Sequence, residues 1–222
     1  WRIPGTHSLP SILSTMPEQS AEANRQVGRS DDRARINEDD ALILYTGGTT
    51  GPAKGAMLTH SNLINNMMQL RSVSQHLIND GKDTIIAPLP LYHTYAFMLH
   101  VMTCFYAGNH NVLIPNPRDL DDLIKTLKGL PEIHGFVGIN TLFLAMCRHK
   151  DIGQVDFSNM RFTGSGGMAL TIRVAEEWQR VTGCQVYEGY GLTECSPVVS
   201  INPHDDVRIG TVGIPVPGTD VK

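Results

Sequence analysis

The sequence predicts an α/β fold: a layered, mainly parallel sheet with flanking helices. Short apolar runs typical of buried strands alternate along the chain with segments whose apolar residues recur at helical spacing. Small or polar residues follow several of these runs, and α/β folds bind their ligands at such strand ends. The 222 residues, 41% of them hydrophobic, suffice for one sizeable core and therefore for one or two domains.

The expected elements follow one another in a regular order. Residues 1–38 mix proline, polar and alternately charged residues, so we expect a partly irregular connector before a domain at 39–222. Strands are expected at 41–44, 55–58, 84–87, 111–114 and 133–137, and from about 161 and 186 onward. Helices are expected after the N-cap residues Thr59 and Asp119, at 94–105 and 140–147, and between the turn at 164–168 and Gly183.

Composition and charge exclude several classes of protein. The net charge of −4, without a basic block, argues against a nucleic-acid partner. No apolar run approaches the roughly 18 to 20 residues that cross a bilayer, and no signal-peptide pattern is recognised. We therefore expect a cytoplasmic protein whose membrane contact, if any, is peripheral at the inner face. The four cysteines lie far apart without a C-x-x-C pair, which favours free thiols over a zinc site or disulfides.

The segment Tyr45–Gly55 is the first cluster with chemical meaning. Its four glycines let backbone N–H groups approach a ligand, while its three threonines and Lys54 add hydroxyl donors and a positive charge, so it suits phosphate. The run 41–44 predicts a buried strand before this loop. A Walker loop is excluded, because that motif needs Gly before its Lys and Ser or Thr after it, where this chain has Ala53 and Gly55. A surface turn of small residues is the alternative interpretation.

Three further places combine small, aromatic and polar residues. The turn 164–168 is either a structural βα turn or a backbone surface against a flat ring; it is not a nucleophile elbow, because Thr163 stands where that motif needs Gly. In the segment 186–194, Tyr190 offers a ring face, Thr193 a hydroxyl and Glu194 an oxygen ligand for Mg²⁺, although a tyrosine-rich strand with an exposed acid is an equal alternative. His93 follows a predicted strand among aromatics, where a packing role is the commoner one.

Together these clusters resemble the AMP-forming acyl-CoA synthetase superfamily of acyl-adenylate-forming enzymes. The pattern runs from the Tyr45–Gly55 loop through Pro90–His93 and Gly166-Gly167 to Tyr187–Glu194, over about 150 residues. Within the superfamily, the loop is most similar to that of bacterial long-chain fatty acyl-CoA synthetases. Gly47 and Ala53, where the superfamily usually has Ser and Pro, are departures that this subgroup shares. Residues 116–119, 138–143 and 188–195 resemble the subgroup as well.

The resemblance implies a reaction in two halves. A long-chain fatty acid and ATP give an acyl-adenylate and pyrophosphate, and coenzyme A then displaces AMP to give the thioester. ATP/AMP, Mg²⁺ and coenzyme A are the implied cofactor, metal and co-substrate. The resemblance also implies that the chain is the central part of a large N-terminal domain, incomplete at both ends. The ribose-binding acid and the C-terminal domain with its lysine are expected to be absent from these residues, so the fragment alone is expected to be inactive in the full reaction.

The resemblance assigns roles residue by residue. The catalytic residues are expected to be Lys54, His93, Thr193 and Glu194, with Glu194 also the metal ligand. The β- and γ-phosphates are expected on Thr46, Gly47, Gly48, Thr49, Thr50, Gly51 and Lys54, and the α-phosphate on Thr193. The adenine is expected to lie between Gly166, Gly167 and Met168 on one face and the ring of Tyr190 on the other. The remaining nucleotide-binding residues, which are expected to line the pocket, are Tyr187, Glu188, Gly189 and Gly191. The acid is expected near His93, Gly138, Ile139 and Asn140, with an acyl channel drawn from Leu99, Val137, Ile139, Leu142 and Phe143.

Two alternatives stay open from the sequence. The first is an adenylating ligase for another carboxylate, such as a short-chain, aryl or amino acid. The second is a non-catalytic module that binds a nucleotide or an acyl group. The sequence does not predict the oligomeric state or the chain length of the acid.

Overall fold

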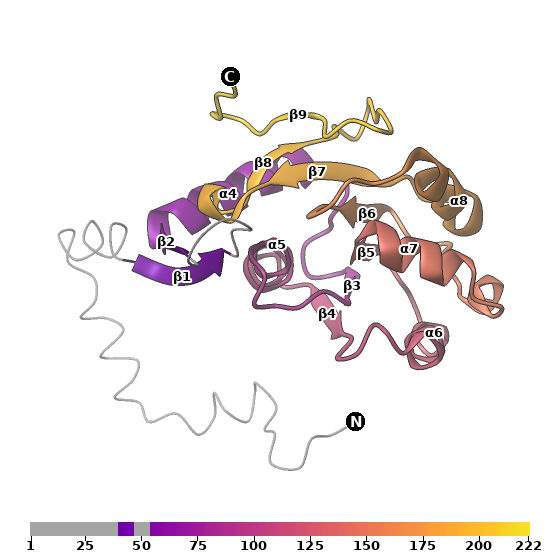
Figure 1. Ribbon diagram of the computed structural model, residues 1–222. Helices are drawn as coiled ribbons and strands as arrows, with labels where there is room; N and C mark the ends of the chain where they lie inside the picture. The colour runs from indigo at the N-terminus through magenta and orange to yellow at the C-terminus, as the bar shows by residue number, and fades with distance from the viewer. Residues whose placement is uncertain (1–39, 47–53) are drawn as a thin grey trace, which may run out of the picture. The chain divides into compact units, whose positions relative to one another are not determined.

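The computed structural model describes residues 40–46 and 54–222 (Figure 1). The predicted connector at 1–38 and the loop residues Gly47–Ala53 lie outside the described residues, so the predictions made for them stay predictions. Among the described helices, none is long and apolar enough to cross a membrane.

A sheet of seven strands forms the centre of the described chain, in the order β4-β3-β5-β6-β7-β8-β9. The pairs from β4 to β7 are parallel, and β8 and β9 add to one side in antiparallel pairing. The mainly parallel α/β fold is therefore confirmed. The strands are β3 (Thr84–Ala87), β4 (His110–Leu113), β5 (Gly135–Gly138), β6 (Phe162–Ser165), β7 (Tyr187–Gly191), β8 (Val198–Ile201) and β9 (Ile214–Pro215).

The predicted strand at 41–44 exists, but the prediction that it is buried is wrong. Strand β1 (Asp40–Thr46) pairs only with β2 (Lys54–Thr59), as a separate two-stranded antiparallel sheet. Ile43 is 53% exposed and Tyr45 76% exposed, because one face of the hairpin has no cover among the described residues. The apolar run thus belongs to a half-exposed hairpin rather than to the parallel sheet.

Helices cover both faces of the seven-stranded sheet (Figure 1). Residues of α6, α7 and α8 share one core with Ile86 and Phe136, whereas residues of α4 and η1 share another with Ile85, Val137 and Phe162. The helices are α4 (His60–Ser74), α5 (Thr94–Ala96), the π-helix η1 (Phe97–Cys104), α6 (Leu120–Lys128), α7 (Asn140–Cys147) and α8 (Ile172–Thr182), with the short 3₁₀ turns η2 (Ile152–Gln154) and η3 (Thr193–Cys195).

Trp178 on α8 is the centre of the first core. It is fully buried, and three phenylalanine rings, Phe136, Phe143 and Phe157, surround it at centroid distances of 4.7–6.1 Å. Its indole Nε1 donates to Thr163 Oγ1 at 3.1 Å, so the one polar atom of the side chain is satisfied. The helix ends at Gly183 in a left-handed conformation, φ +73°, as predicted.

Helix α4 joins the hairpin to the second core. Thr59 accepts from the backbone N–H of Asn62 and Asn62 in turn accepts from Thr59, which makes the predicted N-cap a complete capping box. Further along, Asn66 donates to the backbone carbonyl of Val198 at 2.8 Å and accepts from its N–H at 2.9 Å. This pair of bonds fixes α4 to β8.

The segment predicted as a helix at 94–105 is helical, and most of it has π-helical hydrogen bonding. His100 on η1 is buried, and its Nδ1 lies 3.0 Å from the side-chain oxygen of Asn111 on β4. Burial lowers the pKa of His100 to about 4, because the charged imidazolium would lose its hydration. Nearby Thr103 is buried with a hydroxyl that has no partner among the described residues.

Three smaller predictions, on the 164–168 turn, on Leu77 and on the cysteines, can be compared with the structure. The predicted turn at 164–168 begins late, since Gly164 and Ser165 still belong to β6. Leu77 lies beyond the end of α4, although it is buried. All four cysteines are free, as predicted, and burial raises the pKa of Cys104 to about 12, so that thiol stays protonated.

Candidate active site

A cavity of about 290 Å³ lies where β3, β6 and β7 end. The carboxyl ends of parallel strands meet at one edge of a sheet, so residues far apart in sequence converge there. Many of the predicted site residues line this cavity: Thr46, His93, Gly166, Gly167, Tyr187, Gly189, Tyr190, Gly191, Thr193 and Glu194. The structure therefore brings residues from all four places singled out in the sequence together at one cavity.

Tyr95 forms part of the wall on the β6 side. A Cβ on Gly166 would lie 3.2 Å from the Tyr95 ring, and one on Gly164 would lie 3.3 Å from its hydroxyl, so these glycines let the ring pack against the strand. The hydroxyl is buried without a partner in the described residues. Burial raises the pKa of Tyr95 above its ordinary value, which keeps the hydroxyl neutral and able to donate.

The two glycines of β7, Gly189 and Gly191, are explained by a different contact. A Cβ on Gly191 would collide with the carbonyl oxygen of Pro197, and one on Gly189 would lie 3.0 Å from the carbonyl of Ser200. Close pairing with the next strand therefore accounts for both glycines without a ligand. Between them, Tyr190 is 45% exposed and lines the cavity, so its ring is available to a planar ligand.

Thr193 and Glu194 follow β7 in the short turn η3. The hydroxyl oxygens of Thr193 and Thr94 lie 3.3 Å apart, which links this turn to the start of α5. Glu194 is exposed and lines the cavity, and no salt bridge forms to it within the described residues. An unpaired carboxylate beside a hydroxyl is a suitable donor pair for a hard cation.

His93 precedes α5 and caps it, because its Nδ1 accepts from the backbone N–H of Tyr95 at 3.2 Å. In the neutral ring the remaining proton then lies on Nε2, which leaves one donor for a ligand in the cavity. His93 is exposed, so the packing role that its surroundings predicted is not found; it caps α5 and lies in the cavity wall.

Glu188 and Asn140 support the turn behind the cavity rather than line it. Glu188 is buried, and its Oε1 accepts from the N–H of Leu170 at 2.8 Å. Asn140 Oδ1 accepts from both the N–H and the hydroxyl of Thr171, at 3.0 and 3.1 Å. The two side chains anchor the chain just after the predicted ring-binding turn, and their direct binding roles stay predictions.

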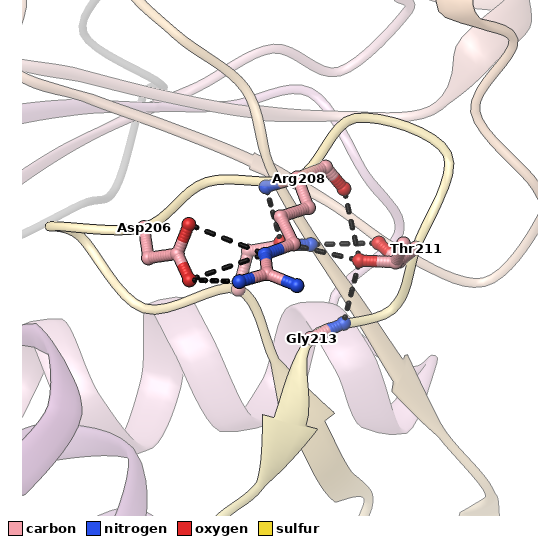
Figure 2. A network of polar contacts seen from close by, with 5 residues as sticks. Asp206, Arg208, Thr211 and Gly213 are labelled. Carbon is pink, nitrogen blue, oxygen red and sulfur yellow. Dashed lines mark hydrogen bonds and ion pairs between the residues drawn. The ribbon is translucent and has the colours of Figure 1, made fainter.

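The loop between β8 and β9 contains a network of polar contacts (Figure 2). Asn202 donates to the backbone carbonyl of Glu188 at 3.0 Å and to that of Thr211 at 2.7 Å, and it accepts from the N–H of Arg208. Figure 2 shows the Arg208 guanidinium against the carboxylate of Asp206, with their closest atoms 2.8 Å apart. Asn202 thereby links this loop to the backbone of β7.

Four other predicted residues lie outside the cavity wall. Lys54 begins β2 opposite Thr46, whose hydroxyl donates to the Lys54 carbonyl at 3.2 Å. Met168 is half exposed. A Cβ on Gly138 would lie 2.9 Å from the Phe143 ring, and Ile139 packs against the first core. No ligand contact of these four can be deduced from the described geometry.

Among the acyl-channel candidates, only Leu99 lines the cavity. Val137, Leu142 and Phe143 are buried in the two cores, as ordinary core residues would be. Sequence reasoning missed most of the actual apolar wall, which consists of Leu70, Phe162, Leu192, Pro197, Val198 and Ile201. It also missed Thr94 and Tyr95, for which their position directly after His93 was the available signal.

No group of three or more His, Cys, Asp or Glu residues that could hold a metal ion occurs in the part of the chain that the structure describes. A metal bound tightly by protein ligands alone is therefore not supported by these residues. Magnesium differs, because it is commonly held by one or two carboxylates together with substrate phosphates and water. Glu194 at the cavity suits that mode of binding.

Several known proteins are similar to this chain in sequence. Long-chain-fatty-acid–CoA ligase from Salmonella typhimurium is 45% identical over 188 residues, and the matched part is 84% of this chain and 33% of that protein. The ligase of the same name from Bacillus subtilis is 32% identical over 183 residues, 82% of this chain and 32% of that protein. The chain thus spans about a third of the length of these relatives.

Solved structures agree with the fold. ATP-bound MatB from Rhodopseudomonas palustris matches with a TM-score of 0.70 and 31% identity, over 82% of this chain and 35% of that one. The anthranilate CoA ligase AuaEII in complex with anthranoyl-AMP matches with a TM-score of 0.74 and 27% identity, over the same shares. The sequence profile described as AMP-binding enzyme matches residues 6–222. The chain therefore belongs to the AMP-binding enzyme family.

Proposed function

We propose that this chain is the nucleotide-binding centre of an ATP-dependent ligase that converts a long-chain fatty acid to its coenzyme A thioester. The observation that carries the proposal is the single cavity shared by His93, the Gly166-Gly167 turn, Tyr190, Thr193 and Glu194. A ring face, hydroxyl donors, a carboxylate and an apolar wall in one place are what an acid and a nucleotide need if they are to react. The similarity to long-chain-fatty-acid–CoA ligases supports the choice of acid.

In the first half-reaction, a carboxylate oxygen of the acid attacks the α-phosphorus of ATP, and pyrophosphate leaves. Both reactants are anions, so the protein must lower their mutual repulsion and align them. The hydroxyl of Thr193 is proposed to donate to an α-phosphate oxygen. The ring of Tyr190 is proposed to stack on the adenine, and His93 Nε2–H to donate to the carboxylate of the acid. No covalent intermediate with the protein is required.

Magnesium, when bound, would neutralise phosphate charge during this step. Glu194 is the residue proposed to hold it, with phosphate oxygens and water completing its coordination. The exposed and unpaired carboxylate at the cavity supports this assignment, because no neighbouring cation among the described residues competes for it.

In the second half-reaction, the thiol of coenzyme A attacks the acyl carbonyl carbon of the adenylate, and AMP leaves as the thioester forms. The described residues contribute the walls that hold the adenylate during this exchange. The proposal assigns the remaining parts of the reaction to regions of a longer protein, which agrees with the span of about a third that this chain covers in its relatives.

A ligase for a shorter or aromatic acid is the second candidate, and the cavity volume favours it. About 290 Å³ lies at the lower end of the range for ligand sites, roughly 300 Å³ and upward, and the nucleotide must share the space. The MatB and anthranilate ligase structures are neighbours at 27–31% identity. A long chain would need additional room along Leu70, Phe162 and Ile201.

The test is exchange of labelled pyrophosphate into ATP by the complete protein that contains these residues. We expect exchange to depend on a long-chain acid such as palmitate, and not on acetate, benzoate or an amino acid. Exchange that is equally fast with benzoate or acetate would replace the long-chain proposal by the second candidate. Absence of exchange with every acid, together with retained ATP binding, would support a binding module.

Glu194→Gln is the variant that tests the site itself. We expect about a hundredfold loss of exchange, most severe at limiting Mg²⁺, because a principal charge ligand is removed. Glu177→Gln on α8 is the matched control, since its side chain is 40% exposed, pairs with Arg180 and lies outside the cavity wall. Equal activity of both variants at low Mg²⁺ would remove Glu194 from its proposed role.

A further inference from the structure

Thr94 is a buried residue that no part of the sequence pattern singled out. It is 3% exposed and begins α5, directly between His93 and Tyr95, and all three residues line the cavity. Its hydroxyl oxygen lies 3.3 Å from that of Thr193, and this is the only side-chain hydrogen bond of Thr94 within the described residues. The contact spans 99 positions in sequence and joins the β3 side of the cavity to the β7 side.

The direction of this hydrogen bond has a chemical consequence. A hydroxyl has one hydrogen to donate and two lone pairs to accept with. If Thr193 donated to Thr94, it would have no hydrogen left for a phosphate oxygen. If Thr94 donates, Thr193 accepts on one side and keeps its own hydrogen for an anion in the cavity. Only the second arrangement lets Thr193 donate to a phosphate.

From this geometry we infer that Thr94 is a positioning residue: it donates to Thr193 and orients the Thr193 hydroxyl toward the phosphate at which the acid reacts. The inference rests on the proposed function. Thr94 does not itself touch the nucleotide in this scheme. Because the preceding residue, His93, is the one proposed to donate to the acid, the same bond helps to set the spacing between the acid and the phosphate donor.

Burial strengthens the argument. A buried hydroxyl without a partner costs stability, and the contact with Thr193 gives the buried Thr94 hydroxyl its partner. The same helical segment contains Thr103, which is fully buried and has no hydrogen-bond partner among the described residues. Thr103 lies outside the cavity wall. It therefore provides a matched control in which a buried threonine changes to valine without loss of a described hydrogen bond.

The experiment compares Thr94→Val, Thr94→Ser and Thr103→Val in the complete protein, with acid-dependent pyrophosphate exchange as the readout. Valine keeps the shape of threonine and removes the hydroxyl. We expect Thr94→Val to lower kcat about three- to tenfold, the effect of one neutral hydrogen bond, with the KM of the acid almost unchanged. Thr94→Ser should restore most of the rate, and Thr103→Val should leave it unchanged.

A double-mutant cycle tests the coupling directly. In a Thr193→Val background, Thr94→Val should cause no further loss, because the hydroxyl that it orients is already absent. The same loss in both backgrounds would overturn the inference, and so would an unchanged kcat in the single variant or a failure of serine to rescue. Thermal unfolding and ATP binding of each variant separate a folding defect, which would lower Tm, from the expected loss of rate at unchanged Tm.

Failure of the proposed function would look different from failure of this inference. A wild-type protein that binds ATP but never exchanges pyrophosphate would overturn both the reaction and the role of Thr94 in it. An active wild type with an unaffected Thr94→Val variant would overturn the role of Thr94 alone. The wild-type activity measurement therefore decides which of the two has failed.

Discussion

The seven-stranded sheet and the β1–β2 hairpin contribute to the same cavity with very different support. Every residue of β5 and β6 is buried, whereas one face of the hairpin exposes Ile43, Tyr45 and Met57. The sheet brings Gly166, Tyr187 and their neighbours to the cavity, and the hairpin brings Thr46, the last residue before the glycine loop. Residues that define the pocket thus lie on packed strands, and the predicted phosphate loop lies on the less supported element.

The largest effect should come from the core beneath the sheet. Trp178→Ala removes the ring that Phe136, Phe143 and Phe157 surround and leaves a cavity, so we expect a loss of about 3–5 kcal/mol in the free energy of unfolding. Denaturant-induced unfolding measures it. Met57→Ala on the hairpin is the control, because a side chain that is 64% exposed should change stability by less than about 0.5 kcal/mol. Similar losses in both variants would remove the distinction between sheet and hairpin.

Lowering the pH should decrease the free energy of unfolding through the protonation of His100. Its pKa is lowered from an ordinary 6.5 to about 4 in the folded protein, so between these values the unfolded chain binds a proton that the folded chain does not. Stability is therefore fully present above about pH 6.5 and falls as the pH decreases toward 4, by about 3 kcal/mol from this group. Below that range the contribution is lost and the curve flattens. Unfolding measured from pH 7 to pH 4 gives the slope.

His100→Gln separates this residue from other acid effects. Glutamine keeps a side-chain amide that can bond Asn111 and does not titrate, so the slope between pH 6.5 and 4 should decrease. An identical slope in wild type and variant would show that His100 is not the origin of the acid sensitivity.

An effect of intermediate size on stability is expected at Glu188, through which β7 holds the segment after the 164–168 turn. Glu188→Ala leaves the N–H of Leu170 without its partner, which should cost about 2 kcal/mol of stability and weaken ATP binding. Unfolding and calorimetric titration with ATP measure the two effects. Glu177→Ala on α8 removes a carboxylate that pairs with Arg180 outside the cavity wall and should leave ATP binding unchanged. Unaltered ATP binding in both variants would mean that the turn does not shape the nucleotide site.

How far the sequence predicts this fold depends on how locally each element is determined. Helix α7 occupies the predicted 140–147, and β3 the predicted 84–87, because a run of apolar residues marks each of them and Pro88 follows the strand. Strands β8 and β9 were not predicted. Their pairing depends on contacts with distant segments, such as the bonds between Asn66 and Val198. Strand β1 was predicted as buried because an apolar run of four residues does not reveal how many neighbours it has.

The residues of the candidate site also divide into those that the sequence predicts and those that only the tertiary fold reveals. Clusters such as Thr193 and Glu194 were visible because their polar residues interrupt apolar segments, and resemblance to a family supplied their roles. Thr94, Leu70 and Phe162 look like ordinary core residues in sequence, and only the tertiary fold places them in the cavity wall. Glu188 shows the reverse case, since a residue expected to contact the adenine has a carboxylate engaged with Leu170.

The smallest effect is expected at the junction of the two regions, where β2 continues into α4. Thr59→Ala removes the side-chain acceptor for the N–H of Asn62, and loss of such a cap typically costs about 1 kcal/mol. Thr59→Ser keeps the acceptor and should restore stability in the same unfolding measurement. Since Leu63, Met67 and Leu70 on α4 stay buried in the second core, the sheet should remain folded while the first turn of α4 frays. Hydrogen exchange should then increase at His60–Leu63 and not in β5 or β6. Faster exchange throughout the sheet would mean that the hairpin and the sheet unfold as one unit, and that their different exposure does not reflect different stability.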